Sequence, residues 1–305
     1  MYRYKKLMVN LNLDKNDINL LAYAGFISQM AKSEEIHFVY VADTFDVPDE
    51  IKKIYPQLAS PVNDAAEERI KEFVEQHFKG YGESRLIFKV MEGPPLGRLV
   101  SFTKKYDIDL LIVSHHKSGS GSNGYLSEKL TRKAFCSVLM IPWHSRLNLE
   151  KILVAVDFSE HSINALDIGS AFAKGVEANE IYILNNFRIP KGYYKTGKSY
   201  EEFADVMYEN ATTKFKSILP KVNLKGVGIK PYFKRTNNIV QGIHSFAETI
   251  DAGLIVVGAR GRSGDISAIL LGSITEGLIR NLTRPLLAVK NKGEGLNILE
   301  ALSST

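Results

Sequence analysis

The chain of 305 residues has one cysteine, one tryptophan and no long apolar run. The single thiol, Cys136, excludes an intramolecular disulfide and a cysteine-rich metal site, as expected in a reducing compartment. Apolar runs such as the one at 110–113 are far shorter than the roughly 20 residues that span a bilayer. No apolar signal segment follows the charged start at 1–6. These absences predict a cytoplasmic protein that does not enter a membrane.

The charge balance shows no excess that would mark a nucleic-acid-binding face. The formal net charge is +5, but Lys and Arg are interleaved with Asp and Glu along the chain instead of forming a basic block. Apolar residues make up 45% of the chain and charged residues 24%, which is the balance of a packed globular protein. We therefore predict a solvated mixed surface and no nucleic-acid partner.

Motifs of the common catalytic and metal sites are also missing. The chain has no P-loop, no G-x-S-x-G elbow and no H-E-x-x-H pair. His115 and His116 are adjacent after an apolar run, and adjacent residues of an extended chain point to opposite sides. They make a poor metal pair, so a surface loop is the preferred interpretation. The sequence predicts neither a catalytic residue nor a metal held by the protein.

What the chain does contain is an internal repeat. The segment KLMVNLN at 6–12 matches KILVAVD at 151–157, and DLLIV at 109–113 matches GLIVV at 253–257. The copies are 145 residues apart for the first pair and 144 for the second, which indicates a duplicated domain.

The repeat predicts two domains. We place the first at 1–145 and the second at 149–292. The segment 142–149 contains Pro, Ser and Asn and is typical of a linker. The residues at 293–305, with glycines followed by a Ser-Ser-Thr end, are expected to form a flexible tail.

Each half alternates short apolar runs with amphipathic stretches of helical length. Runs of Val, Ile and Leu without polar alternation are typical of parallel strands buried on both faces, and such strands need crossover helices. The expected strands are 6–11, 36–41, 84–90, 109–113 and 137–141, then 152–156, 181–184, 228–233, 254–257 and 285–289. The expected helices of the second half are 164–174, 200–219, 239–250 and 274–281. The fold class is therefore α/β, with helices on both faces of a parallel sheet in each half.

A glycine-containing loop follows the fourth expected strand of the second half. The stretch VGARGRSG at 257–264 precedes LGSIT at 271–275, which opens an expected helix. In open α/β sheets, ligands bind beyond the carboxyl ends of the strands. Glycines there can take positive φ or let the backbone approach a ligand, and the free N–H groups of a helix start suit phosphate oxygens. A tight turn with a serine cap is the alternative, but two glycine clusters favour a polyphosphate site.

This pattern resembles the universal stress protein family. The resemblance rests on Gly-x-x-Gly, a spacer, Gly-Ser, a short helix and an apolar strand after Arg284, together with VAVDFS at 154–159. It covers nearly all of both halves. It implies two tandem Rossmann-like domains of the adenine nucleotide alpha hydrolase-like type, each with a five-stranded parallel sheet. In ATP-binding members of the family, this loop holds the triphosphate.

Carried over residue by residue, the resemblance implies an ATP site in the second half, to which any Mg²⁺ would come with the phosphates. Ala155, Asp157 and Asn186 would line the adenosine end, and Gly258 would lie by the ribose. The phosphate end would comprise Gly261, Gly272, Ser273, Ile274 and Thr275. Independently of the resemblance, Arg260 and Arg262 add positive charge that suits phosphates. Ten residues, not the family's nine, separate Gly261 from Gly272, and the extra residue is expected to alter the loop.

The first half departs from the family pattern. Its counterparts are Ser114 for Gly258, Lys117 for Gly261, Tyr125 for Ser273 and Asn12 for Asp157. A tyrosine would fill phosphate space, and the glycine-rich segment 118–124 lacks the spacing. We predict a degenerate loop that does not bind ATP in the family's manner.

Three functions follow from these residues. The first is an ATP-binding stress-response or regulatory protein with at most slow hydrolysis, because Asp157 has no histidine partner and is better explained as a binding or turn residue. The second is a dimerisation or assembly module that no longer uses nucleotide, and the third is an ATPase or transferase. Family members commonly pair through the last strand, here 286–289. The resemblance therefore implies an intramolecular pseudo-dimer of the halves, with a homodimer as the alternative.

Overall fold

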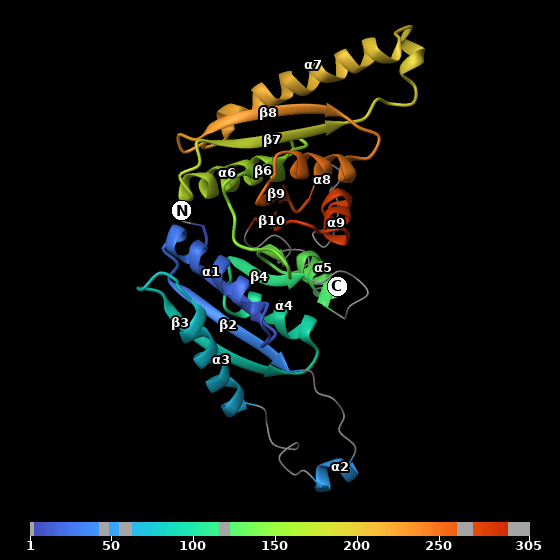
Figure 1. The fold of residues 1–305 in the computed structure, drawn as a ribbon. Helices are drawn as coiled ribbons and strands as arrows, with labels where there is room; N and C mark the ends of the chain where they lie inside the picture. Colours follow the sequence, from blue (N-terminus) through green and yellow to red (C-terminus); the bar gives the residue numbers. More distant parts are fainter. Residues whose placement is uncertain (1–2, 43–48, 55–62, 116–122, 261–270, 292–305) are drawn as a thin grey trace, which may run out of the picture. The chain divides into compact units, whose positions relative to one another are not determined.

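The computed structural model of the chain describes residues 3–42, 49–54, 63–115, 123–260 and 271–291 (Figure 1). Contacts between residues divide the chain into a first unit, Met1–His144, and a second unit, Ser145–Thr305. The division falls inside the segment 142–149 that the sequence assigns to a linker. The tail predicted at 293–305 lies outside the described residues.

The described part of the first unit has five parallel strands in the order β3-β2-β1-β4-β5. The strands are β1 (Lys6–Leu11), β2 (Glu35–Ala42), β3 (Arg85–Glu92), β4 (Leu110–His115) and β5 (Ser137–Pro142). The helices are α1 (Asp17–Ala31), α2 (Asp49–Ile54), α3 (Asn63–His77), α4 (Pro95–Lys105) and α5 (Asn123–Lys133). Helix α1 contacts α3 and helix α4 contacts α5, as expected when right-handed crossovers place one pair on each face of the sheet.

The second unit repeats this topology with the order β10-β9-β6-β7-β8. Its strands are β6 (Ile152–Ala155), β7 (Glu180–Phe187), β8 (Gly228–Arg235), β9 (Leu254–Gly258) and β10 (Leu286–Val289). Its helices are α6 (Glu160–Gly175), α7 (Tyr200–Ile218), α8 (Ile239–Thr249) and α9 (Ser273–Arg280), with 3-10 turns η2 (Tyr193–Thr196) and η3 (Leu219–Lys221). The predicted fold class, an α/β domain with a five-stranded parallel sheet in each half, is confirmed.

The cores lie on both faces of the central strands. Every residue of β4, β5 and β10 is buried, which explains why these strands are apolar without alternation. The outer strand β8 is mostly exposed and contains Pro231, a residue that sheets accept at an edge. Position within the sheet therefore decides the composition of each strand.

The turn after the first strand is alike in the two units. Leu13 has φ 59° and Phe158 has φ 66°, so both lie in the left-handed region that bulky residues rarely adopt. The two positions are 145 residues apart, which is the offset of the sequence repeat. The duplication therefore preserves the backbone of this turn.

Helix α6 and strand β7 of the second unit extend at least three residues beyond a bound that the sequence predicts. Helix α6 begins at Glu160, four residues before the expected 164, because Ser159 caps it by accepting from the Ser162 N–H at 3.3 Å. Strand β7 continues to Phe187 through two asparagines. The Asn185 amide is buried and donates to the Val156 carbonyl at 2.8 Å, so a polar side chain is satisfied inside the strand.

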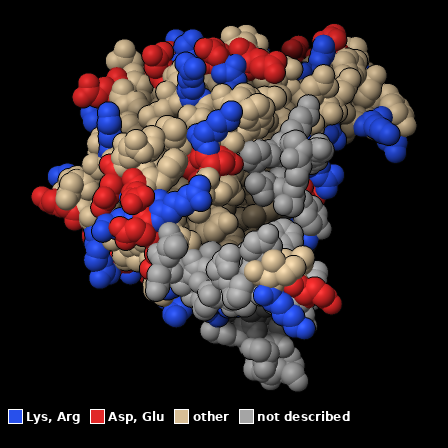
Figure 2. All heavy atoms as spheres, turned by 60° about the horizontal axis from the view of Figure 1, so that its bottom comes forward, with Lys and Arg blue, Asp and Glu red and all other residues tan. Residues whose placement is uncertain are grey.

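The described surface carries mixed charge. On the face in Figure 2, Lys and Arg side chains lie among Asp and Glu side chains. Arg284 pairs with Asp251 at 2.7 Å and Arg235 with Glu201 at 2.7 Å, and both pairs join segments distant in the sequence. No helix in the described ranges has the length and apolar character needed to cross a bilayer.

Candidate functional site

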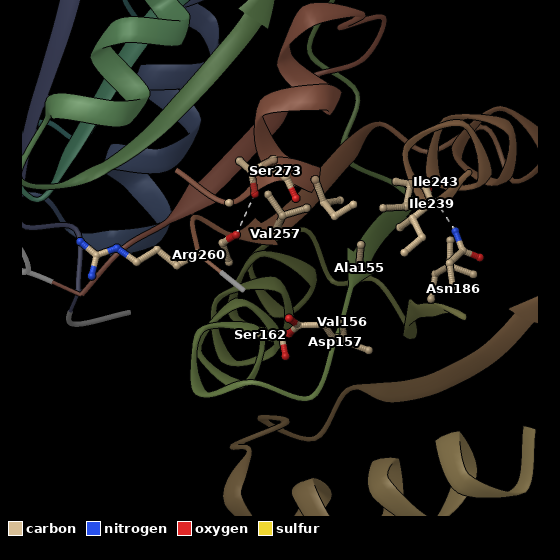
Figure 3. A pocket seen from close by; sticks show the side chains of 15 residues that line it. Ala155, Val156, Asp157, Ser162, Asn186, Ile239, Ile243, Val257, Arg260 and Ser273 are labelled. Atoms are coloured by element: carbon tan, nitrogen blue, oxygen red, sulfur yellow. Dashed lines mark hydrogen bonds between the residues drawn. The ribbon is translucent and has the colours of Figure 1, made fainter. Parts of the chain in front are cut away.

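A cavity opens at the carboxyl ends of β6, β7 and β9 in the second unit, beside the first turns of α6, α8 and α9 (Figure 3). It encloses about 900 Å³ of empty space, part of it open to solvent. Its lining residues are Ala155, Val156, Asp157, Ser162, Leu184, Asn186, Ile239, Ile243, Val257, Gly258, Arg260, Gly272, Ser273, Ile274 and Thr275. This is the position at which α/β sheets bind ligands.

One end of the cavity is aliphatic. Leu184 extends from β7, and Ile239 and Ile243 lie one turn apart on α8, so that they share a helix face. Such a wall suits a flat, weakly polar ring, which it would remove from water without demanding hydrogen bonds. Sequence reasoning missed these three residues as site residues. Two signals were available in the sequence: the i,i+4 spacing of Ile239 and Ile243, and the i,i+2 spacing of Leu184 and Asn186.

Asn186 lies at the same end. Its side-chain nitrogen donates to the Ile239 carbonyl at 3.4 Å, which joins the end of β7 to the start of α8. A Cβ on Gly242 would stand 2.6 Å from that nitrogen. The glycine inside α8 therefore makes room for the amide.

The turn after β6 is fixed by its own hydrogen bonds. The Asp157 Oδ1 atom accepts from the Ser159 N–H at 3.0 Å and from the Ser159 hydroxyl at 2.6 Å. The Ser162 hydroxyl in turn donates to the Ser159 carbonyl at 2.9 Å. Asp157 thus holds the turn that leads from β6 into α6, with its side chain at the cavity (Figure 3).

The other end of the cavity is the start of α9. Gly272 is the N-cap with extended backbone, φ −63° and ψ 139°, and as a glycine it has no side chain with which to cap the helix. No described residue accepts a hydrogen bond from the N–H groups of Ser273, Ile274 or Thr275. Three main-chain donors at the positive end of a helix dipole are suited to an anionic group.

Gly258 serves this site for a reason that the sequence does not reveal. It ends β9 in extended conformation and has no positive φ. A Cβ there would lie 2.8 Å from the backbone carbon of His161 and 2.9 Å from its carbonyl oxygen. The missing side chain lets the first turn of α6 pack directly against β9.

The structure brings most of the predicted site residues together. Those at the cavity are Ala155, Asp157, Asn186, Gly258, Arg260, Gly272, Ser273, Ile274 and Thr275. The Arg260 side chain extends away from the end at which Asn186 lies (Figure 3). Gly261 and Arg262 lie outside the described residues.

The corresponding space in the first unit is nearly closed. It measures about 190 Å³, and its lining residues are Asn10, Asn12, Val113, Ser114, Leu126, Ser127 and Leu130. The Asn12 amide donates to the Ser114 hydroxyl at 2.9 Å across this space. Asn10 stands where the second unit has Ala155, which adds further polar bulk. Lys117 and the segment 118–122 lie outside the described residues.

The placement of His115 in a surface loop is wrong. His115 is the last residue of β4 and is only 4% exposed. Its Nδ1 atom lies 2.7 Å from the Ser127 hydroxyl on α5. A polar side chain at a strand end is buried here because a partner on the covering helix satisfies it.

Comparisons with known proteins agree on one family. The sequence profile described as "Universal stress protein family" matches residues 3–142 and again 148–290. A curated universal stress protein of Methanocaldococcus jannaschii is 32% identical over 161 residues, which are 47% of this chain and 96% of the relative. A second from the same organism is 30% identical over 145 residues, 46% of this chain and 82% of the relative.

A solved structure supports the fold over nearly the whole length. The crystal structure of a universal stress protein from Archaeoglobus fulgidus superposes with a TM-score of 0.62 at 19% identity, covering 94% of this chain and 99% of that one. The resemblance predicted from the glycine loop and the Asp-x-Ser turn is thereby confirmed. The chain belongs to the universal stress protein family and carries one such domain in each half.

Proposed function

We propose that the second unit binds an adenine nucleotide, with ATP as the ligand, and that occupancy of this site serves stress response or regulation. The observation that carries the proposal is the cavity at the carboxyl ends of β6, β7 and β9, which combines an aliphatic wall with a helix start. The base would lie against Leu184, Ile239 and Ile243. The phosphates would lie at the N–H groups of the first turn of α9.

The site suits binding better than turnover. Among the described lining residues the titratable groups are Asp157 and Arg260, and the Asp157 carboxylate already accepts two hydrogen bonds from Ser159. A general base needs an oriented partner and a reach to the attacking water, and the described lining has no histidine. Any Mg²⁺ would be held chiefly by the phosphates, since no group of three His, Cys, Asp or Glu is clustered for a metal within the described residues.

Titration of the purified chain with ATP by calorimetry tests the proposal. We expect about one site per chain, because the space in the first unit is nearly closed. Gly272→Val should weaken ATP binding at least about tenfold, since a branched side chain at the N-cap would occupy phosphate space. Gly124→Val, at the counterpart position of the first unit, is the matched control and should bind as the wild type does.

Equally weak binding of ATP by the wild type and by Gly272→Val would contradict the proposal. Two sites per chain would instead refute the prediction for the first unit. Mass spectrometry of the denatured protein adds an independent reading, because an adenine nucleotide retained through purification would support a physiological ligand of this class.

The first unit favours a different role within the same chain. Its space is spanned by the Asn12–Ser114 hydrogen bond, and His115 and Ser127 are joined beside it. We propose that this unit is a structural or assembly module that uses no nucleotide. The predicted pseudo-dimer of the halves stays a prediction, for which light scattering of the intact chain would show whether further chains associate.

A further inference from the structure

The hydroxyl of Thr275 is already engaged within the protein. It donates to the Gly258 carbonyl at 3.0 Å, and Thr275 is only 3% exposed. A threonine hydroxyl has one hydrogen to donate, and phosphate oxygens need donors. The same hydroxyl therefore cannot serve a phosphate while it holds Gly258.

A second hydrogen bond lies beside the one from Thr275 to Gly258. The Gly272 N–H donates to the Ala259 carbonyl at 2.9 Å, so the first turn of α9 is bonded to two successive carbonyls at the end of β9. These two bonds join the segments on either side of 261–270, which lie outside the described residues. They fix the direction of the N–H groups that follow Gly272.

The first unit provides an internal comparison. Counting back from the last strand, Ser127 is the counterpart of Thr275, and counting along the fourth strand, His115 is the counterpart of Ala259. The Ser127 hydroxyl lies 2.7 Å from the Nδ1 atom of the His115 side chain. In the unit with the nearly closed space, the helix residue thus meets a side chain of the fourth strand, whereas in the unit with the open cavity the Thr275 hydroxyl meets a main-chain carbonyl.

From this difference we infer that Thr275 is a positioning residue of the nucleotide site: its hydroxyl aims the amides of the α9 first turn at the phosphates and does not itself bind them. The inference rests on the proposed function for its ligand. It assigns to Thr275 a task other than the phosphate contact that the family resemblance implies for its side chain.

The test compares Thr275→Val, which keeps the shape and removes the hydroxyl, with Thr275→Ser, which keeps the hydroxyl. Hydrogen exchange of the Glu276 amide, which donates to the Gly272 carbonyl at 2.9 Å in the first turn of α9, is measured by NMR without nucleotide. Binding of AMP, ADP, ATP and adenosine is measured by calorimetry. We expect faster exchange in Thr275→Val and an affinity loss of about tenfold, of similar size for all three nucleotides, with adenosine unchanged. Thr275→Ser should restore both, and Ser127→Ala should leave nucleotide binding unchanged.

Three results would overturn the inference. These are unchanged amide exchange in Thr275→Val, a loss confined to ligands that carry one particular phosphate, and failure of Thr275→Ser to restore binding. A wild-type chain that binds no nucleotide would defeat the proposed function instead. The exchange measurement would then still decide whether the hydroxyl orders the first turn of α9.

Discussion

Replacing Gly258 by alanine is expected to destabilise the second unit by about 2 kcal/mol, on the scale of overpacking in a closely packed interior. The added Cβ would lie 2.8 Å from the backbone carbon and from the Cβ of His161. Most of the close atoms belong to the backbone of the first turn of α6, so no side-chain rotation relieves the clash. Either α6 or the end of β9 must move.

The same change should weaken the proposed ATP binding at least about tenfold, because both displaced elements line the cavity. Differential scanning calorimetry reads the stability and titration calorimetry the affinity. Gly192→Ala is the matched control in the same unit, since its Cβ would meet only the Lys195 side chain at 4.0 Å and its φ is −91°. A Gly258→Ala protein with wild-type stability and affinity would contradict the assigned packing role.

The first unit contains a carboxylate whose burial should make its stability depend on pH. Asp17 is fully buried at the start of α1. Its Oδ2 atom accepts from the N–H groups of Asn12 at 2.9 Å, Leu13 at 2.7 Å and, more distantly, Asp14 at 3.4 Å. Its Oδ1 atom is buried without a hydrogen-bond partner among the described residues. Burial outweighs the three donors and raises the pKa of Asp17 to about 7 from 3.8.

The direction of the effect follows from linkage. Because the folded pKa exceeds the unfolded one, the folded chain binds more protons between about pH 4 and about pH 7. This group's contribution to stability is therefore largest at acidic pH and is lost as pH rises through about 7. Asp17→Asn does not titrate at this position. Between about pH 4.5 and about pH 8, the unfolding free energy of the wild type should therefore fall by about 3 kcal/mol more than that of Asp17→Asn.

The single tryptophan makes this measurable. Trp143 follows β5 at the end of the first unit, and its main-chain N–H donates to the His115 carbonyl at 3.2 Å. Its fluorescence in urea titrations at the two pH values should report unfolding of this unit. Asp205→Asn removes an exposed carboxylate on α7 and should leave the pH profile as in the wild type. Identical profiles for the wild type and Asp17→Asn would show that Asp17 does not titrate in this window.

The fold was predictable because both halves have strong, repeated patterns. Apolar runs marked the strands of both units, and amphipathic stretches marked the helices of the second unit to within a few residues. The boundaries of the helices and strands were harder to predict from the sequence. Ser159 caps α6 and starts it early, and the Asn185 side chain extends β7 through a buried hydrogen bond. Such boundaries depend on single polar contacts that periodicity does not contain.

The lining of the candidate site was predictable where glycine spacing and strand ends decide it, as at Gly258 and Gly272. The aliphatic wall was missed because Ile239 and Ile243 look like any core positions of an amphipathic helix. The burial of His115 was missed for a similar reason. Its partner Ser127 lies twelve residues away, and only the packing of α5 on β4 brings the two together.

Because the chain is duplicated, its two units can be compared with each other, and the comparison is most informative at the left-handed turn that contains Leu13 in one unit and Phe158 in the other. One copy adjoins an open cavity and the other a nearly closed one, yet both retain the unfavourable dihedral angle. The cost of that conformation is therefore a cost of the architecture, incurred to turn a central strand into its covering helix. Leu13→Gly would relieve this conformational cost in the first unit and would leave the nucleotide site proposed for the second unit unaltered.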